Sequence, residues 1–183
     1  MKKLGNKIYS LDLGIEWIDN YEEVCDKLIR RHRASLIHYR IRNTYVTIPK
    51  KEYCKIFEDH LLKSIKNQFD KIQISDGHSI FTYVSNNQWA KNEWHNHLTS
   101  FSSPNKGLST VFYLKKPDCE DGKISIIDDD NFQIDYLPKQ GEYLIFPLHY
   151  MHCPTKYDNK EHRIAINLNV MTSNTYSEFF LNN

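Results

Sequence analysis

The sequence predicts a mainly β (α+β) protein, a jelly roll or β-sandwich whose N-terminal helices pack on one sheet. Two observations lead to this fold class. In the second half of the chain, short apolar runs recur at regular intervals between polar turns, which is typical of antiparallel sandwiches and barrels. The segments with helical spacing all precede residue 75, so the helices should support one face of the barrel.

The predicted core strands are bounded by turn residues. Glycine, proline, asparagine and aspartate are frequent in the intervening segments, which are 104–107, 120–122, 128–131 and 138–141. The apolar runs between and beside these turns predict strands at 108–114, 123–127, 132–136, 143–146 and 164–170.

The first elements of the chain support this core. Weak alternation over residues 7–13 predicts an opening strand. A helix should begin at Asp19 or Asn20 and end near Arg31, with a buried stripe of Tyr21, Val24 and Leu28. Residues 35–47 are rich in β-branched and aromatic side chains, which favours a strand.

The clearest helix follows Pro49. Apolar and small residues recur there at spacings of three and four, namely Tyr53, Ile56, Phe57, Leu61, Ser64, Ile65 and Phe69. His60 is expected to be solvated. Asp76 and Gly77 predict a turn, after which residues 78–84 should form a strand.

Composition limits the classes of protein to consider. With 183 residues, 40% hydrophobic and 26% charged, the chain can bury a core and is expected to form one domain over 1–183. Its supporting region is 1–77 and its β core about 78–172. A formal net charge of +1 gives no indication of nucleic-acid binding. No apolar run approaches the roughly 20 residues of a membrane helix.

The cysteines and the N-terminus predict a cytoplasmic protein. Residues 1–6 are basic but lack the apolar run of a signal peptide. Four cysteines are widely spaced without a CxxC motif, which favours reduced thiols over a disulfide framework. Cys153 could be a metal ligand because it follows His152, but a buried structural thiol is the favoured interpretation.

His95 and His97 predict a metal site. In a strand their side chains point to the same face, with Cα atoms roughly 6.5 Å apart, so both imidazoles can approach one ion. A third ligand must come from elsewhere, and His152 is the candidate. His149 could be a ligand, a donor to a ligand, or an ordinary loop histidine.

The strand predicted at the end of the core has one apolar and one polar face. Arg163, Ala165, Asn167 and Asn169 share the polar face. That face could meet solvent, or it could line a barrel that holds an anion. The periodicity leaves both alternatives open.

These residues resemble the 2-oxoglutarate/Fe(II)-dependent dioxygenase superfamily, and especially its prolyl-hydroxylase-like branch. The matching residues, over about 80–170, are His95-Asn96-His97, a strand that ends Tyr113-Leu114, Gly141 through Phe146-Pro147, then His152 and Arg163. The resemblance implies a double-stranded β-helix that binds Fe(II) and the cosubstrate 2-oxoglutarate. The implied activity is hydroxylation of an unidentified substrate with conversion of 2-oxoglutarate to succinate.

The resemblance also implies roles for individual residues. The metal ligands would be His95, His97 and His152. Arg163 would bind the distal carboxylate of 2-oxoglutarate through a two-pronged contact. Tyr113 would donate a hydrogen bond to the same carboxylate or be a core tyrosine, and Ser109 and Asn167 are weaker candidates for the cosubstrate pocket.

His97 departs from the family pattern, which has a carboxylate there. Three neutral imidazoles leave the metal charge uncompensated, so the site should favour anionic ligands and alter Fe(II) binding. If His97 were not a ligand, water or a halide could take its place.

Two other functions remain open. A cupin-like three-histidine enzyme would need no keto acid, although it gives Arg163 no role and the usual downstream glutamate is missing. A barrel that binds a small anion without catalysis would need no metal. The substrate could be a small molecule or a peptide; Trp89, Trp94 and the loop 98–107 could shape the pocket mouth or, for the tryptophans, lie in the core. Oligomeric state is left open, with a homodimer as one option.

Overall fold

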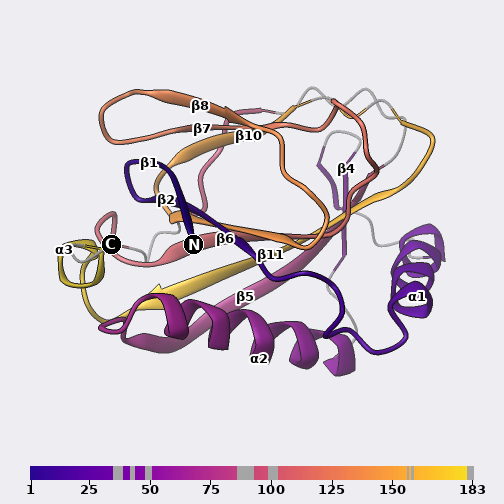
Figure 1. Ribbon diagram of the computed structural model, residues 1–183, viewed down its shortest axis with the longest axis horizontal. Coiled ribbons are helices and arrows are strands. Elements are labelled where there is room, and N and C mark those ends of the chain that lie inside the picture. Colours follow the sequence, from indigo (N-terminus) through magenta and orange to yellow (C-terminus); the bar gives the residue numbers. More distant parts are fainter. Residues whose placement is uncertain are drawn as a thin grey trace.

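The computed structural model describes residues 1–180 apart from 35–38, 42–43, 48–50, 86–92, 99–102, 156 and 158. In this part of the chain the strands form two antiparallel sheets that face each other (Figure 1). The larger sheet has the order β1 (Lys2–Gly5), β2 (Ile8–Asp12), β9 (Glu142–Pro147), β6 (Leu108–Lys115), β11 (Arg163–Thr172), β5 (Ile74–Ser85), β4 (Thr44–Thr47) and β3 (Tyr39–Ile41). The smaller sheet has the order β10 (Met151–Pro154), β7 (Ile124–Ile127) and β8 (Gln133–Tyr136).

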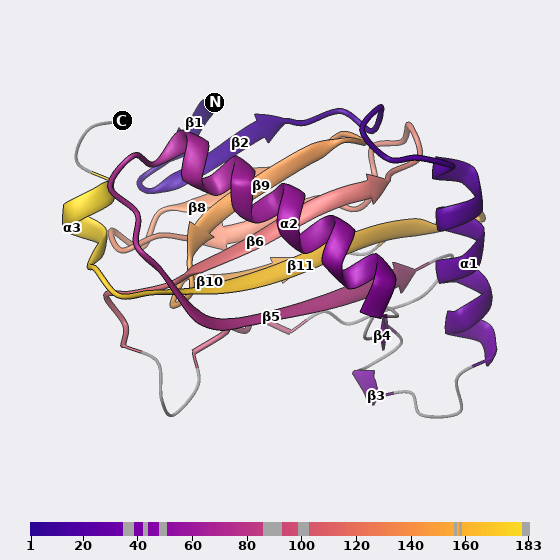
Figure 2. The same cartoon turned by 90° about the horizontal axis from the view of Figure 1, so that it is seen from below.

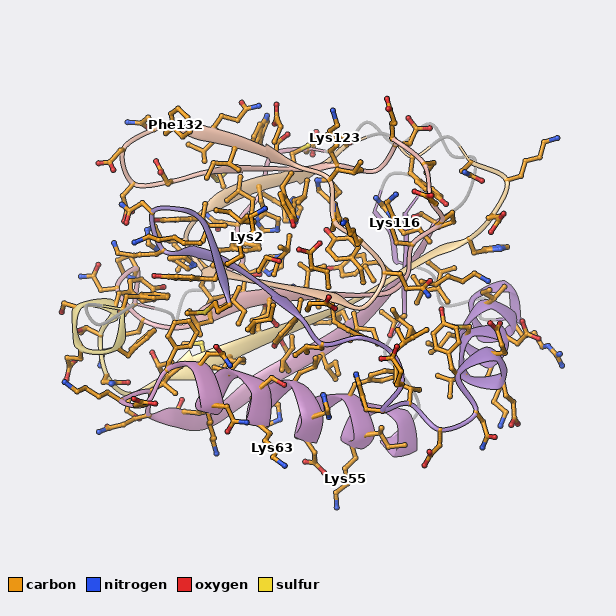
Figure 3. All side chains as sticks on the ribbon, viewed as in Figure 1. Lys2, Lys55, Lys63, Lys116, Lys123 and Phe132 are labelled. Carbon is orange, nitrogen blue, oxygen red and sulfur yellow. The ribbon has the colours of Figure 1, made fainter. Side chains whose placement is uncertain are left out.

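Helix α2 (Lys51–Gln68) covers the outer face of the larger sheet (Figure 2). Its buried stripe is Phe57, Leu61 and Ile65, and Phe69 continues it just beyond the helix. Figure 3 shows Lys55 and Lys63 pointing away from the sheet on the opposite side of the helix. The predicted support of one sheet by an N-terminal helix is therefore confirmed.

Two shorter elements lie at the ends of the larger sheet. Helix α1 (Tyr21–Ala34) lies at one end and adds Val24 and Leu28 to the outer core. Helix α3 (Tyr176–Phe179) lies at the other end. Its presence shows that the expectation of helices only before residue 75 was wrong. None of the described helices is long and apolar enough to span a membrane.

A second core fills the space between the two sheets. It contains Tyr113, Leu144 and Ala165 from the larger sheet and Ile126 from the smaller one. Along β11 the residues alternate, so Ile164, Ile166, Leu168 and Val170 pack in the outer core beneath α2. The polar face of β11 consequently points into the interior between the sheets, where Arg163, Ala165 and Asn167 are buried and Asn169 is partly exposed.

Most of the predicted strands are confirmed, with two additions and one correction. Strands β1 and β10 were not predicted. Strand β5 runs without a break through Asp76 and Gly77, so the predicted turn there was wrong. Pairing with β11 continues past this point, from His78 opposite Val170 to Ile74 opposite Thr172, and Asp76 and Gly77 fall at the register shift between these two pairs.

The remaining differences concern the first helical region. The strand predicted over 35–47 corresponds to the two short strands β3 and β4. Residues 35–38 and 42–43 of this segment lie outside the described residues, as does Pro49. Ile56 is 51% exposed and does not belong to the buried stripe. His60 is not a freely solvated side chain, because its ring stacks on Trp17 at a centroid distance of 3.7 Å. The assignment of 1–183 to one domain stays a prediction.

The packing of α2 generates a stability test with an internal control. Leu61→Ala should lower the free energy of unfolding by about 2–5 kcal/mol, because the side chain is fully buried against the sheet. Ile56→Ala, on the exposed side of the same helix, should change it by less than about 0.5 kcal/mol. Urea unfolding measures both, and equal losses would show that α2 does not pack as described.

Candidate metal centre

Backbone hydrogen bonds bring the three predicted histidines together. His95 is not part of a strand but forms one antiparallel bridge with His152 on β10, with N–H to O=C distances of 3.0 and 2.8 Å. Two residues on, the N–H of His97 donates to the carbonyl of Leu148 at 3.1 Å. The strand predicted around His95 is thus reduced to a short extended segment, but the common direction of the two side chains is retained.

The three imidazoles form a compact group. One ligand atom from each lies within 4.8 Å of those of the other two. Metal–imidazole bonds are about 2 Å long, so donors that share an ion at right angles lie about 3 Å apart. The three histidines are therefore grouped closely enough to be candidates for one metal ion.

In two of these rings, a hydrogen bond to the backbone carbonyl two residues earlier sets the tautomer. The Nδ1 of His95 donates to the carbonyl of Glu93 at 2.9 Å, and the Nδ1 of His152 donates to the carbonyl of Tyr150 at 3.1 Å. A carbonyl oxygen only accepts, so each Nδ1 carries the proton and each Nε2 keeps its lone pair. This is the arrangement that metal-binding histidines require.

His97 obtains the same arrangement from a side chain. Its Nδ1 lies 2.6 Å from Oδ1 of Asn169 and 3.0 Å from Oγ of Ser109. The amide oxygen can only accept, so Nδ1 of His97 is protonated and Nε2 is again the free ligand atom. Asn169 was not singled out from the sequence, although its place on the polar face of β11 was a usable signal.

Electrostatics keep the three rings neutral. Partial removal of its ring from water lowers the pKa of His95, although the residue as a whole is exposed, and burial lowers the pKa of His97 to about 4 and that of His152 well below its ordinary value. The neighbouring histidines lower the pKa of His152 further. Three neutral imidazoles with free Nε2 atoms suit a borderline divalent cation such as Fe(II), Co(II), Ni(II) or Zn(II).

Arg163 lies at the first position of β11, inside the fold. It is 8% exposed, and its Nε donates to Oγ of Ser85 at 3.2 Å while Nη1 donates to the carbonyl of Gly122 at 3.3 Å. The guanidinium also lies over the ring of Tyr157 at 4.9 Å. Among the described residues no carboxylate forms an ion pair with it.

The guanidinium of Arg163 keeps N–H donors that the described residues do not use. Arginine has five N–H donors, and the bonds to Ser85 and Gly122 use two, which leaves three. Burial lowers the pKa of Arg163, yet a guanidinium stays protonated at neutral pH. Burial raises the pKa of the nearby Tyr113 hydroxyl, so that hydroxyl remains a donor. This end of the interior therefore presents a positive charge and hydrogen-bond donors that the described residues do not use.

Ser109 and Asn167 lie on neighbouring strands. The Nδ2 of Asn167 donates to the carbonyl of Thr110 at 2.8 Å and to Oγ of Ser109 at 3.4 Å. Asn167 is 2% exposed, and its Oδ1 is buried without a hydrogen-bond partner in the described part of the chain. The structure therefore places Ser109 against a histidine of the cluster, and Asn167 beside it with an acceptor unused.

His149 and Cys153 do not join the cluster. The Nε2 of His149 pairs with Oδ1 of Asp129 at 2.7 Å, and the other oxygen of Asp129 pairs with Lys7 at 2.7 Å. These contacts tie the turn before β10 to the β1–β2 hairpin. The thiol of Cys153 is half-buried and donates to the carbonyl of Pro154 at 3.7 Å, and its assignment as a structural thiol stays a prediction.

Among the described residues, the His95 side of the histidine cluster is exposed to solvent. Within the cluster His152 is buried whereas His95 is exposed. Trp94, next to His95, is 40% exposed and is not a core residue, while Trp89 lies outside the described residues.

The cluster generates a direct binding test. Wild-type protein should bind one equivalent of Co(II), and His95→Ala, His97→Ala and His152→Ala should each weaken binding by at least about 100-fold, because each removes one of three ligands. Competition with a chromophoric chelator measures the affinities. His149→Gln is the matched control and should bind Co(II) like the wild type; a loss there as large as in the other three would contradict the assignment.

Comparisons by sequence identify no relative: no protein-family model and no curated protein matches this chain. Solved structures do match. A prolyl-4-hydroxylase from Pseudomonas putida is 14% identical with a TM-score of 0.64, over 92% of this chain and 94% of that one. A prolyl hydroxylase from Trichoplax adhaerens, in complex with a hypoxia-inducible-factor peptide fragment, is 14% identical with a TM-score of 0.70, over 97% and 88%.

A third similar structure is HygX from Streptomyces hygroscopicus, with nickel, 2-oxoglutarate and hygromycin B bound. It is 12% identical with a TM-score of 0.64, over 91% of this chain and 83% of that one. At such identities the likeness is one of fold. It confirms the predicted jelly-roll class, and this chain has the fold of the prolyl-hydroxylase-like 2-oxoglutarate oxygenases.

Proposed function

We propose that this protein is a 2-oxoglutarate- and Fe(II)-dependent oxygenase that hydroxylates a small molecule or a peptide. The observation that carries the proposal is the buried Arg163, which has no acidic partner among the described residues and shares an interior with three converging imidazoles. An unpaired buried charge is destabilising by several kcal/mol. A ligand carboxylate would offset that penalty.

2-Oxoglutarate matches both ends of this interior. Its distal carboxylate would accept hydrogen bonds from Arg163 and from the Tyr113 hydroxyl, in the two-pronged geometry that guanidinium favours. Its keto-acid end carries the negative charge that a three-imidazole centre does not supply. The ligands of the metal would be His95, His97 and His152.

The residues of this chain then have separate tasks. The protein binds and orients the cosubstrate and keeps the inner side of the centre dry, since the fully buried Phe146 packs on the ring of His152 at 5.0 Å. The exposed side at His95 admits the substrate. When bound, Fe(II) supplies oxygen activation coupled to conversion of 2-oxoglutarate to succinate, which leads to hydroxylation of a C–H bond.

A cupin-like metal enzyme that uses no keto acid is the second candidate. It is favoured by a cluster of three histidines that includes no carboxylate. It leaves the buried Arg163 and its unused donors without a role, which is why the first function is preferred. We also infer a reducing, cytoplasmic setting; Cys25 and Cys119 form no disulfide, in keeping with it.

Anaerobic spectroscopy separates these functions. Protein loaded with Fe(II) and 2-oxoglutarate in the absence of air should show a weak visible charge-transfer band. Arg163→Ala should abolish the band and the stabilisation by 2-oxoglutarate while metal content is unchanged, because the carboxylate loses its charged partner. Bound metal without the band in the wild type would favour the cupin-like enzyme, and absence of metal would favour a non-catalytic barrel.

Gly122 provides a second test that leaves Arg163 in the sequence. A Cβ at Gly122 would lie 2.6 Å from Nη1 of Arg163, so Gly122→Ala should displace the guanidinium and weaken 2-oxoglutarate binding by at least about 10-fold. Gly122 has a φ of +76°, so Gly14→Ala (φ +61°) is the control for backbone strain away from Arg163. Calorimetric titration with 2-oxoglutarate should give near wild-type affinity for Gly14→Ala and weaker binding for Gly122→Ala.

A further inference from the structure

We propose that Asn169 is a positioning residue for the metal centre: it fixes the tautomer and ring orientation that make His97 a ligand. The inference deepens the proposed function and rests on its metal centre. It concerns the ligand at which this chain departs from the family it resembles, since an imidazole stands there in place of a carboxylate.

The contact is short and comes from a rigid element. Oδ1 of Asn169 lies 2.6 Å from Nδ1 of His97. Asn169 is on β11 and pairs directly with Ser109 on β6, so both side chains flank the imidazole from the inner face of the larger sheet. Strand β11 is hydrogen-bonded on both sides, to β5 and to β6, which holds Asn169 in place.

His97 differs from the other two histidines in this respect. The rings of His95 and His152 are oriented by carbonyls two residues earlier in their own backbone, and those acceptors exist whatever the side chains are. The ring of His97 is oriented by side chains from distant strands. In the cluster, His97 is therefore the ligand whose tautomer depends on the sequence elsewhere.

The amide oxygen determines which nitrogen of His97 faces the metal. If this acceptor were lost, the remaining partner of Nδ1 would be the Ser109 hydroxyl, which can either donate or accept, so either nitrogen of His97 could carry the proton. A fraction of molecules would then present N–H instead of a lone pair to the ion. Losing an acceptor of this kind typically costs 10- to 100-fold in metal affinity.

The experiment compares two substitutions of nearly equal size. Asn169→Leu keeps the volume and removes the acceptor, whereas Asn169→Asp keeps an acceptor oxygen. Co(II) affinity, measured by chelator competition, should fall about 10- to 100-fold in Asn169→Leu and stay within a few-fold of the wild type in Asn169→Asp. Asn67→Leu, at an exposed position of α2, is the control for the chemical change and should bind Co(II) normally.

A second readout reports the tautomer itself. In the Zn(II)-loaded protein, long-range ¹H–¹⁵N correlation spectra should show a proton on Nδ1 of His97 in the wild type and in Asn169→Asp. In Asn169→Leu the Nδ1–H signal should weaken or exchange rapidly. Thermal unfolding of the metal-free proteins identifies a variant that fails to fold, in which case Asn169→Ala replaces Asn169→Leu.

Three results would overturn the inference. The first is an Asn169→Leu variant with the Co(II) affinity and the His97 tautomer of the wild type. The second is an equal loss of Co(II) affinity in Asn169→Leu and Asn169→Asp. The third is a folded wild-type protein that binds no Co(II). The last would also remove the proposed function. Wild-type protein that binds Co(II) but shows no charge-transfer band with Fe(II) and 2-oxoglutarate would refute that function alone, and the cobalt titrations would still decide the role of Asn169.

Discussion

The backbone bridge between His95 and His152 is the contact on which the candidate metal centre depends. Two hydrogen bonds join segments from distant parts of the chain and place both imidazoles on one side of the bridge. His152 is in turn held by β10, which pairs with β7 in the smaller sheet. His97 is anchored two residues on by the carbonyl of Leu148. The histidine cluster is thus a consequence of strand pairing. A change in register at β10 would separate the three imidazoles even if every histidine remained.

The second constraint is the charge distribution in the interior. The histidines are neutral because burial lowers their pKa values, and Arg163 contributes a positive charge that no described carboxylate balances. A divalent ion would add further positive charge. Removing ions from water is destabilising by several kcal/mol each, so the interior as a whole favours an anionic ligand more strongly than a site with an aspartate would. The lack of a carboxylate in the described histidine cluster and the presence of Arg163 therefore favour the same class of ligand, an anion.

The sequence predicted the elements whose period or turn residues are local properties. The stripe of α2 and the short apolar runs of the second half are of this kind. Strand β10 was missed because Met151–Pro154 has no alternation, and its conformation comes from pairing with β7. The turn expected at Asp76-Gly77 was overridden by pairing of β5 with β11, and the stacking of His60 on Trp17 joins segments that no periodicity relates.

The site shows the same division between local pattern and register. Motif spacing identified the three histidines and Arg163, and alternation identified the face of β11 on which Asn167 and Asn169 lie. Asn169 contacts an imidazole because it pairs with Ser109 across β11 and β6. That register cannot be predicted from the sequence of either strand alone. Because Arg163 and Asn169 are on the same face of one strand, β11 sets the spacing between the guanidinium and the histidine cluster. The separation of Arg163 from Asn169 is therefore determined by the core of the sheet and not by the loops around it.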